Sequence, residues 1–157
     1  MKLSKNFSLK ELVRSDMAER NGIDNNPKTQ EHVAALAVLA HSILQPVRNE
    51  FGIVTITSGY RSEELNTLCR GSSTSSHCRG EAADFEVFSS DNIKVANWIK
   101  SNLEYDQLIL EFYVKGIPDS GWVHCSYKRD GGNRKQDLTA LKGKGGKTEY
   151  LEGLVDG

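Results

Sequence analysis

The longest regular pattern in the chain lies in residues 26–52, where apolar residues recur every three to four positions, as on the buried face of a helix. Asn26 followed by Pro27 has the form of an N-cap and a first helical residue. Pro46 is expected to kink or shorten this helix, and Gly52 to end it. The residues carrying the pattern are Val33, Leu36, Ala37, Ala40, Ile43, Leu44 and Val47.

Three further helices have local start signals. Ser8 and Glu11 have the spacing of a capping box, which predicts a short helix near the N-terminus. Another helix is expected to begin at Ser62, and a fourth to span about residues 91–100.

Strand patterns alternate with these helices. Residues 53–57 are short and β-branched, and residues 81–88, 107–114 and 121–127 all suit a period of two. Helices early in the chain and a mostly antiparallel sheet later predict an α+β fold, with a small antiparallel sheet and helices packed on one side.

Alternation along the three later strands separates an apolar face from a face with titratable groups. Asp84, Glu111 and His124 each lie on the face opposite the apolar residues of their own strand. If the strands are neighbours, these groups meet on one wall of a cleft. An antiparallel hairpin turning near residues 115–120 would place Glu111 directly across from His124, a register that remains a hypothesis. The same alternation turns Cys125 toward the core.

Composition limits the class of protein. The 157 residues are 38% hydrophobic and 26% charged, which suits one folded domain, expected over residues 1–128, with a glycine- and lysine-rich, loosely held tail over 129–157. A net charge of -1 gives no reason to expect a nucleic acid partner. No stretch approaches the roughly 20 apolar residues of a membrane span, so we expect no membrane insertion. We also expect the protein to be a monomer.

The N-terminus lacks the apolar core of a signal peptide, so synthesis in the cytoplasm is expected. The chain has three cysteines, a small and odd number that does not suit a disulfide framework. A bond between Cys69 and Cys78 outside the cell is left open, and no role is assigned to Cys78.

Two histidines and one carboxylate form a candidate metal site. His77 precedes the strand that carries Asp84, and His124 lies on a later strand. Imidazole and carboxylate donors suit Zn²⁺, and three protein ligands leave a position open for chemistry. The spacing of these residues alone is a weak signal.

Three segments in order resemble a known family. They are Ser75-x-His77-x-x-Gly80-x-Ala82-x-Asp84, TSGYRSEELN (57–66) and WVHCSY (122–127). Together they resemble the zinc D-alanyl-D-alanine carboxypeptidases of the VanY and VanX type, a family that includes phage endolysins cleaving L-alanyl-D-glutamate bonds. The resemblance covers about residues 5–128 and implies a fold like that of the hedgehog signalling domain.

The resemblance implies a role for each matching residue. His77, Asp84 and His124 become the Zn²⁺ ligands, and Arg61 the group that stabilises negative charge on the substrate carbonyl. Ser75 is expected to contact the substrate or a ligand. Gly80 is expected to permit a tight entry into the following strand, and Ala82 to keep the cleft open.

The general base is less well defined, because many relatives carry an acid three residues before the last histidine, where this chain has Gly121. Two candidates remain, Glu111 on the preceding strand and Asp119 in the connecting loop. We favour Glu111, because a strand aims a carboxylate more rigidly than a loop.

Simpler interpretations stand beside these roles. Arg61 can instead pair with Glu63 or Glu64, Glu111 can be a solvated residue on an exposed sheet face, and Trp122 can be a packing residue or a substrate wall.

The function expected from the sequence is zinc-dependent hydrolysis of peptidoglycan stem peptides, by an endolysin that acts on the cell wall after release. A D-Ala-D-Ala carboxypeptidase and a non-catalytic zinc-containing binding module remain alternatives.

Overall fold

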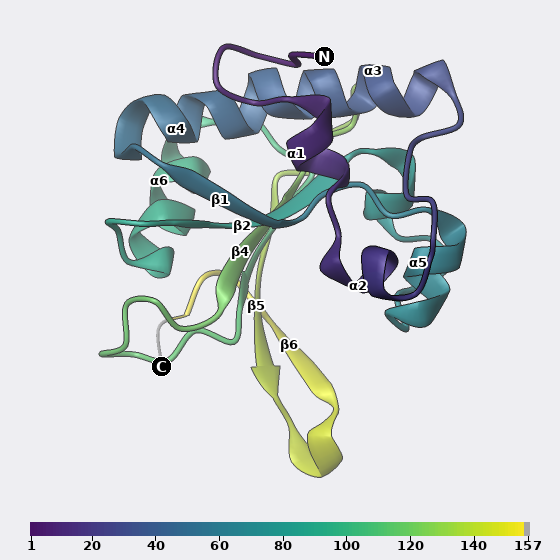
Figure 1. Ribbon diagram of the computed structural model, residues 1–157. Coiled ribbons are helices and arrows are strands. Elements are labelled where there is room, and N and C mark those ends of the chain that lie inside the picture. The colour runs from purple at the N-terminus through teal and green to yellow at the C-terminus, as the bar shows by residue number, and fades with distance from the viewer. Residues whose placement is uncertain (156–157) are drawn as a thin grey trace.

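Within residues 1–155, six strands form one sheet in the order β1-β2-β4-β3-β5-β6 (Figure 1). The strands are β1 (Val54–Ser58), β2 (Ala82–Val87), β3 (Gln107–Glu111), β4 (Trp122–Ser126), β5 (Gln136–Lys142) and β6 (Thr148–Glu152). All neighbours are antiparallel except β3 and β5, which are parallel. This computed structural model describes residues 1–155 and confirms the α+β prediction.

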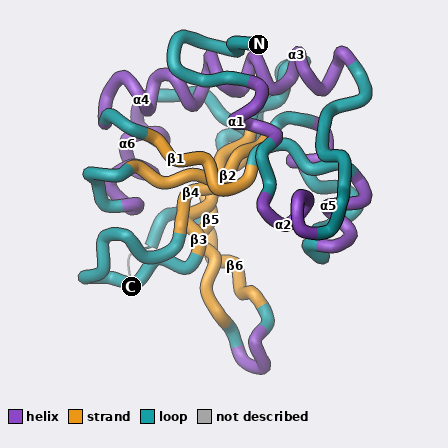
Figure 2. The backbone as a smooth tube through the Cα atoms, viewed as in Figure 1, coloured by secondary structure: helices purple, strands orange, loops and turns teal. Residues whose placement is uncertain are grey.

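Helices pack against one side of this sheet, and the short turn η3 (Lys144–Gly146) joins β5 to β6. The other helical segments are α1 (Leu9–Val13), α2 (Asp16–Arg20), α3 (Gln30–Leu39), the π-helical η1 (Ala40–Leu44), α4 (Gln45–Phe51), α5 (Glu63–Leu68), the 3₁₀ turn η2 (Ser76–Arg79) and α6 (Asn92–Asn102). Figures 1 and 2 show α1, α3 and α4 over the sheet, and α6 contacts β2, β3 and β4. The cleft described below opens on the other face.

The long helix begins later than predicted and passes through Pro46 without ending. Thr29, not Asn26, is the N-cap, and its hydroxyl accepts a hydrogen bond from the His32 N–H at 3.3 Å. Asn26 instead bonds Asp24 in a local turn. Before Pro46 the helix widens into η1, where the backbone N–H of the C-cap residue bonds the carbonyl five residues earlier. This widening accommodates the hydrogen bond that proline cannot donate.

The other predicted helix signals are confirmed. Ser8 and Ser62 cap α1 and α5 through their hydroxyls, and Asp91 caps α6. Gly52 ends α4 with a φ of 99°, a left-handed conformation that glycine adopts without strain.

Strand β3 is shorter than the predicted 107–114. It ends at Glu111 because Phe112 takes a φ of 57°, which lies outside the β region and interrupts the alternation of side chains. The following residue, Tyr113, therefore joins the hydrophobic core, although strict alternation placed it on the opposite face.

The C-terminal segment is not the loosely held tail that its composition suggested. It adds β5 and β6 to the sheet, and β5 pairs with β3 along its length. The hydroxyl of Thr139 donates to the Gly153 carbonyl at 2.7 Å and accepts from the Val155 N–H at 2.9 Å. Sheet pairing and these bonds fix residues 136–155 to the rest of the fold.

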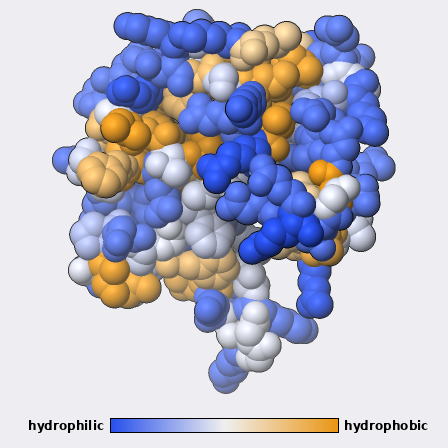
Figure 3. Space-filling view, in the orientation of Figure 1, coloured by the Kyte–Doolittle hydropathy of each residue, from blue (hydrophilic) through white to orange (hydrophobic). Residues whose placement is uncertain are grey.

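The core lies between the helices and the inner face of the sheet. Its largest fully buried side chains include Tyr105, Phe85, Leu36, Leu39 and Ile43. Cys125 is also buried there, as alternation predicted, and all three cysteines are free thiols. Figure 3 shows hydrophilic residues over most of one face, with hydrophobic residues in several separate areas. Within residues 1–155, no helix has both the length and the apolar character needed to cross a membrane.

Candidate metal centre and active-site cleft

Asp84 and His124 are direct partners on neighbouring strands. Their backbone positions pair across β2 and β4, so both side chains point to the same face of the sheet. Nδ1 of His124 lies 2.8 Å from Oδ1 of Asp84, a hydrogen bond between two side chains that are 40 residues apart in the chain. The wall predicted from strand alternation is therefore present.

His77 reaches the same point from η2. The hydroxyl of Ser75 accepts a hydrogen bond from the His77 backbone N–H at 3.2 Å and so caps this turn. Nδ1 of His77 lies 2.7 Å from the carbonyl oxygen of Gly59. Because a carbonyl only accepts, Nδ1 carries the proton and Nε2 keeps its lone pair. Nε2 lies 3.5 Å from Oδ2 of Asp84.

Two glycines allow the backbone around His77 to pack this closely. A Cβ at Gly59 would lie 2.2 Å from the carbonyl oxygen of Leu12 in α1. Gly80 has a φ of 74°, and a Cβ there would lie 2.6 Å from the carbonyl oxygen of His32. The expected tight entry at Gly80 is therefore present, and Gly59 links the site to the N-terminal helix.

The three side chains form a compact donor set for a metal ion. One ligand atom from each of His77, Asp84 and His124 lies within 4.8 Å of the others. Burial alone would raise the pKa of Asp84, but the charges and hydrogen bonds of the two histidines hold it well below its usual range. Asp84 in turn raises the pKa of His124, against the effect of burial. Two imidazoles and an ionised carboxylate fit the donor chemistry of Zn²⁺.

Glu111 shares this wall, but two pairs further along the strands than the hairpin hypothesis placed it. Its partner across β3 and β4 is Trp122, whereas His124 faces Ile109. A displacement of two residues leaves a side chain on the same face, so Glu111 still points into the cleft. Burial and then the charge of Asp84 raise the pKa of Glu111 to about 7, although His124 and Arg61 act in the opposite direction.

The alternative base lies elsewhere. Asp119 is exposed and borders a different hollow, beside Thr55 and Glu86. Gly121, where many relatives carry an acid, has a φ of 62°, and a Cβ there would lie 2.0 Å from the Glu111 carbonyl oxygen. This backbone has no room for an acidic side chain at position 121, and of the two candidate bases Glu111 is the one that lines the cleft.

Arg61 carries a guanidinium group that forms no ion pair with any acidic residue among residues 1–155. Its backbone N–H donates to the His77 carbonyl at 3.2 Å, which ties it to the metal turn. Its Nε is buried without a hydrogen-bond partner in the described chain, and no ion pair with Glu63 or Glu64 forms within residues 1–155. The surface-pairing interpretation of Arg61 is therefore wrong, and its positive charge is available to a ligand.

Trp122 combines packing with access to the cleft. Its ring lies against Phe112 with centroids 5.4 Å apart. Its indole Nε1 is buried, and its interaction with the Glu111 carboxyl lowers the pKa of that group. Both interpretations of Trp122, packing residue and cleft wall, therefore describe part of its environment.

A cavity of about 500 Å³ brings the predicted residues together. Those that line it are Arg61, Ser75, His77, Asp84, Glu111, Trp122 and His124. The lining also includes Asp106, Arg134 and Tyr150, which sequence reasoning did not single out. Residues 148–152 show no alternation of apolar and polar positions, so no signal in the sequence marks the strand that carries Tyr150.

A carboxylate of raised pKa and an unpaired guanidinium beside a His, Asp and His donor set define the site of a metal-dependent hydrolase. The comparison with protein families is more specific. The model of the family described as Peptidase M15 matches residues 5–126, so the chain belongs to the M15 peptidases. Metallopeptidases of this family are generally zinc-dependent. The match ends at the last residue of β4, before β5 and β6. No curated protein compared with the chain matches it.

Proposed function

We propose that this protein is a zinc-dependent peptidase that hydrolyses peptide bonds inside the stem peptides of bacterial peptidoglycan. The observation that carries the proposal is the convergence of His77, Asp84 and His124 in a cleft that also holds Glu111 and Arg61. Membership of the M15 family supports peptidase activity, and the resemblance to wall-cleaving relatives supports the substrate.

The residues of the cleft divide the reaction between them. A Zn²⁺ ion held by His77, Asp84 and His124 would supply the Lewis acidity that activates water and polarises the scissile carbonyl. Glu111 accepts a proton from the attacking water and then donates one to the leaving amine. A pKa near 7 suits both transfers at neutral pH.

Arg61 stabilises the charge that develops on the carbonyl oxygen, because its backbone is bonded to His77 in η2, its side chain lines the cleft, and it forms no ion pair within residues 1–155. Ser75 acts through its bond to the His77 backbone and positions that ligand. Trp122 forms one wall for the peptide.

The charges of the cleft favour an internal bond over a C-terminal one. A carboxypeptidase needs a cation for the free carboxylate of its substrate. The other arginines that line the cleft, Arg79 and Arg134, are paired with Glu81 and Asp106 at 2.7 and 3.0 Å. Arg61 is then the unpaired cleft arginine in the described residues, and the carbonyl oxygen uses it. This supports an endopeptidase of the endolysin type, acting on the wall after release from the cell that makes it.

Digestion of purified muropeptides, followed by mass spectrometry of the fragments, tests the proposal. Zinc-loaded protein should release internal fragments, and a chelated sample should release none. Loss of single terminal D-alanine residues would instead identify a carboxypeptidase. Zinc bound in stoichiometric amount without any hydrolysis would identify a binding module.

The base is tested with two conservative variants. Glu111→Gln should lower kcat by about 10²–10⁴-fold, the range for removal of a general base, while Asp119→Asn should retain wild-type activity. Asp119 is the matched control because it is a carboxylate on the same hairpin that does not line the cleft. The reverse pattern would exclude Glu111 as the base.

A further inference from the structure

Four residues form one row across the cleft face of the sheet. Trp122 on β4 pairs with Glu111 on β3, Glu111 with Ala140 on β5, and Ala140 with Tyr150 on β6. Directly paired residues point to the same side of a sheet. Tyr150 therefore stands on the same face as the proposed base, two strands away and on the side opposite Trp122.

The small residue between them leaves the tyrosine ring uncovered. Ala140 is fully buried and adds only a methyl group to the row, whereas Tyr150 is 55% exposed. Tyr150 and Glu111 line the same cavity. Partial burial and the charge of Glu111 both raise the pKa of the Tyr150 phenol, which agrees with its place beside the carboxylate. An exposed aromatic ring at the wall of a cleft offers contact area at low entropic cost.

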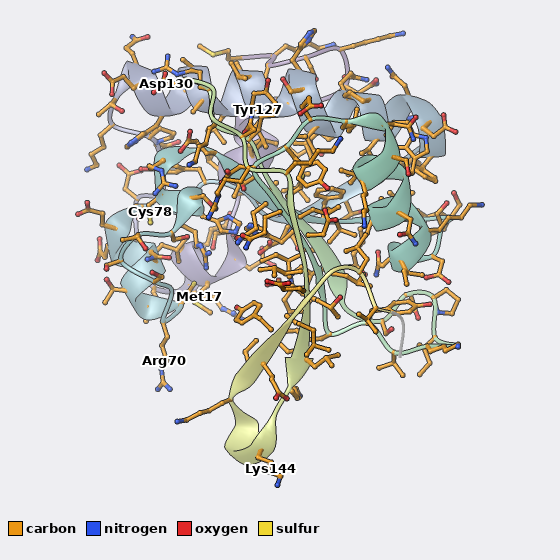
Figure 4. All side chains as sticks on the ribbon, turned by 180° about the vertical axis from the view of Figure 1, so that it is seen from behind. Met17, Arg70, Cys78, Tyr127, Asp130 and Lys144 are labelled. Atoms are coloured by element: carbon orange, nitrogen blue, oxygen red, sulfur yellow. The ribbon has the colours of Figure 1, made fainter. Side chains whose placement is uncertain are left out.

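The hairpin that carries Tyr150 lies outside the family match, which ends at residue 126. In Figure 4 Lys144 marks the tip of this hairpin, which extends away from the helices. Its base is held firmly, because β5 pairs with β3 and Thr139 bonds Gly153. The ring is thus presented by a fixed element.

We propose that Tyr150 forms a peptide-binding subsite, packing its ring on the substrate segment next to the scissile bond, across Glu111 from Trp122. This inference rests on the proposed function for the identity of the substrate, a peptidoglycan stem peptide. The contact is made by the ring, because an exposed aromatic ring offers a large contact area at low entropic cost.

Three variants test the subsite on muropeptide substrate. Tyr150→Ala should raise KM about tenfold and leave kcat within about twofold, because the ring binds but does not react. Tyr150→Phe, which keeps the ring, should retain the wild-type KM. Leu151→Ala is the matched control, since Leu151 is the neighbouring exposed apolar residue of β6 and points to the opposite face. It should leave KM unchanged.

A binding measurement separates this inference from the proposed function. Calorimetric titration of the metal-free protein with the same muropeptide should show a Kd about tenfold weaker for Tyr150→Ala, with no turnover involved. If the zinc-loaded wild-type protein does not hydrolyse the muropeptide that the metal-free protein binds, the proposed function fails, and a weaker Tyr150→Ala complex still supports the subsite. The subsite is overturned if the wild type and Tyr150→Ala bind the muropeptide equally well, or if the wild type does not bind it. It is also overturned if Leu151→Ala weakens binding as much as Tyr150→Ala does.

Discussion

Replacing Glu111 by glutamine should stabilise the metal-free protein at alkaline pH, although the same change should abolish turnover. The carboxylate is partly buried next to Asp84, and these two effects raise its pKa from 4.5 to about 7. Glutamine has nearly the same shape and carries no charge, so it removes the unfavourable ionisation and keeps the packing.

The direction of the pH dependence follows from proton binding. Between about pH 4.5 and 7 the unfolded chain has released the Glu111 proton while the folded chain still holds it. Because the unfolded state then binds fewer protons, the free energy of unfolding falls as pH rises through this window. The raised pKa of Glu111 lowers the free energy of unfolding above pH 7 by at most about 3 kcal/mol. Access of water to the cleft should reduce this loss to about 2 kcal/mol.

Urea unfolding of chelator-treated protein at pH 4 and pH 8 measures the effect. The glutamine variant should match the wild type at pH 4 and exceed it by about 2 kcal/mol at pH 8. Asp119→Asn, a change to an exposed carboxylate, should show no such difference. Added zinc should reduce the advantage, because a nearby cation favours the ionised carboxylate. A stability gain that is the same at both pH values would refute the argument.

Further predictions concern the metal and the glycines. Asp84→Asn should lower the zinc content of the purified protein well below one ion per chain, as measured by elemental analysis, while Asp106→Asn should not. Gly59→Ala should destabilise the fold by about 1–3 kcal/mol in urea unfolding, because its Cβ would lie 2.2 Å from the Leu12 carbonyl oxygen. It should also weaken zinc binding about 10–100-fold in a competition assay with a chelator, because Gly59 orients His77. Gly121→Glu should destabilise the protein without raising kcat, since the backbone at that position opposes a side chain; a more active variant would contradict this.

The site was largely predictable because alternation along a strand determines which face each side chain occupies. This placed Asp84, Glu111 and His124 on one wall. A shift of two residues in the register between β3 and β4 leaves every side chain on the same face, so alternation cannot detect it. The sequence therefore could not show that Trp122 rather than His124 faces Glu111. Only the pairing of backbones across the sheet fixes that register.

The C-terminal strands were missed for a different physical reason. All five residues of β6 are exposed, so the strand has no buried face to produce an apolar alternation. It is held by backbone hydrogen bonds to β5, and β5 by parallel pairing to a strand some 30 residues earlier. Contacts of this kind leave little trace in composition. The start of the long helix was misplaced likewise, because Asn26 and Thr29 are both good caps and only tertiary structure selects between them.

The backbone beyond Glu111 indicates how the fold presents this carboxylate. Phe112 has a φ of 57° and faces Gly121 at 62°, so two left-handed residues lie on the facing strands next to the proposed base. A non-glycine residue in this conformation costs about 1–3 kcal/mol and persists only where its surroundings impose it. Here the Phe112 N–H bonds the Ala140 carbonyl at 2.9 Å and its ring packs on Trp122. Strand β5 thus helps to impose the strained turn that ends β3 at Glu111. The C-terminal hairpin therefore has a structural part in the site through β5, in addition to presenting Tyr150 on β6.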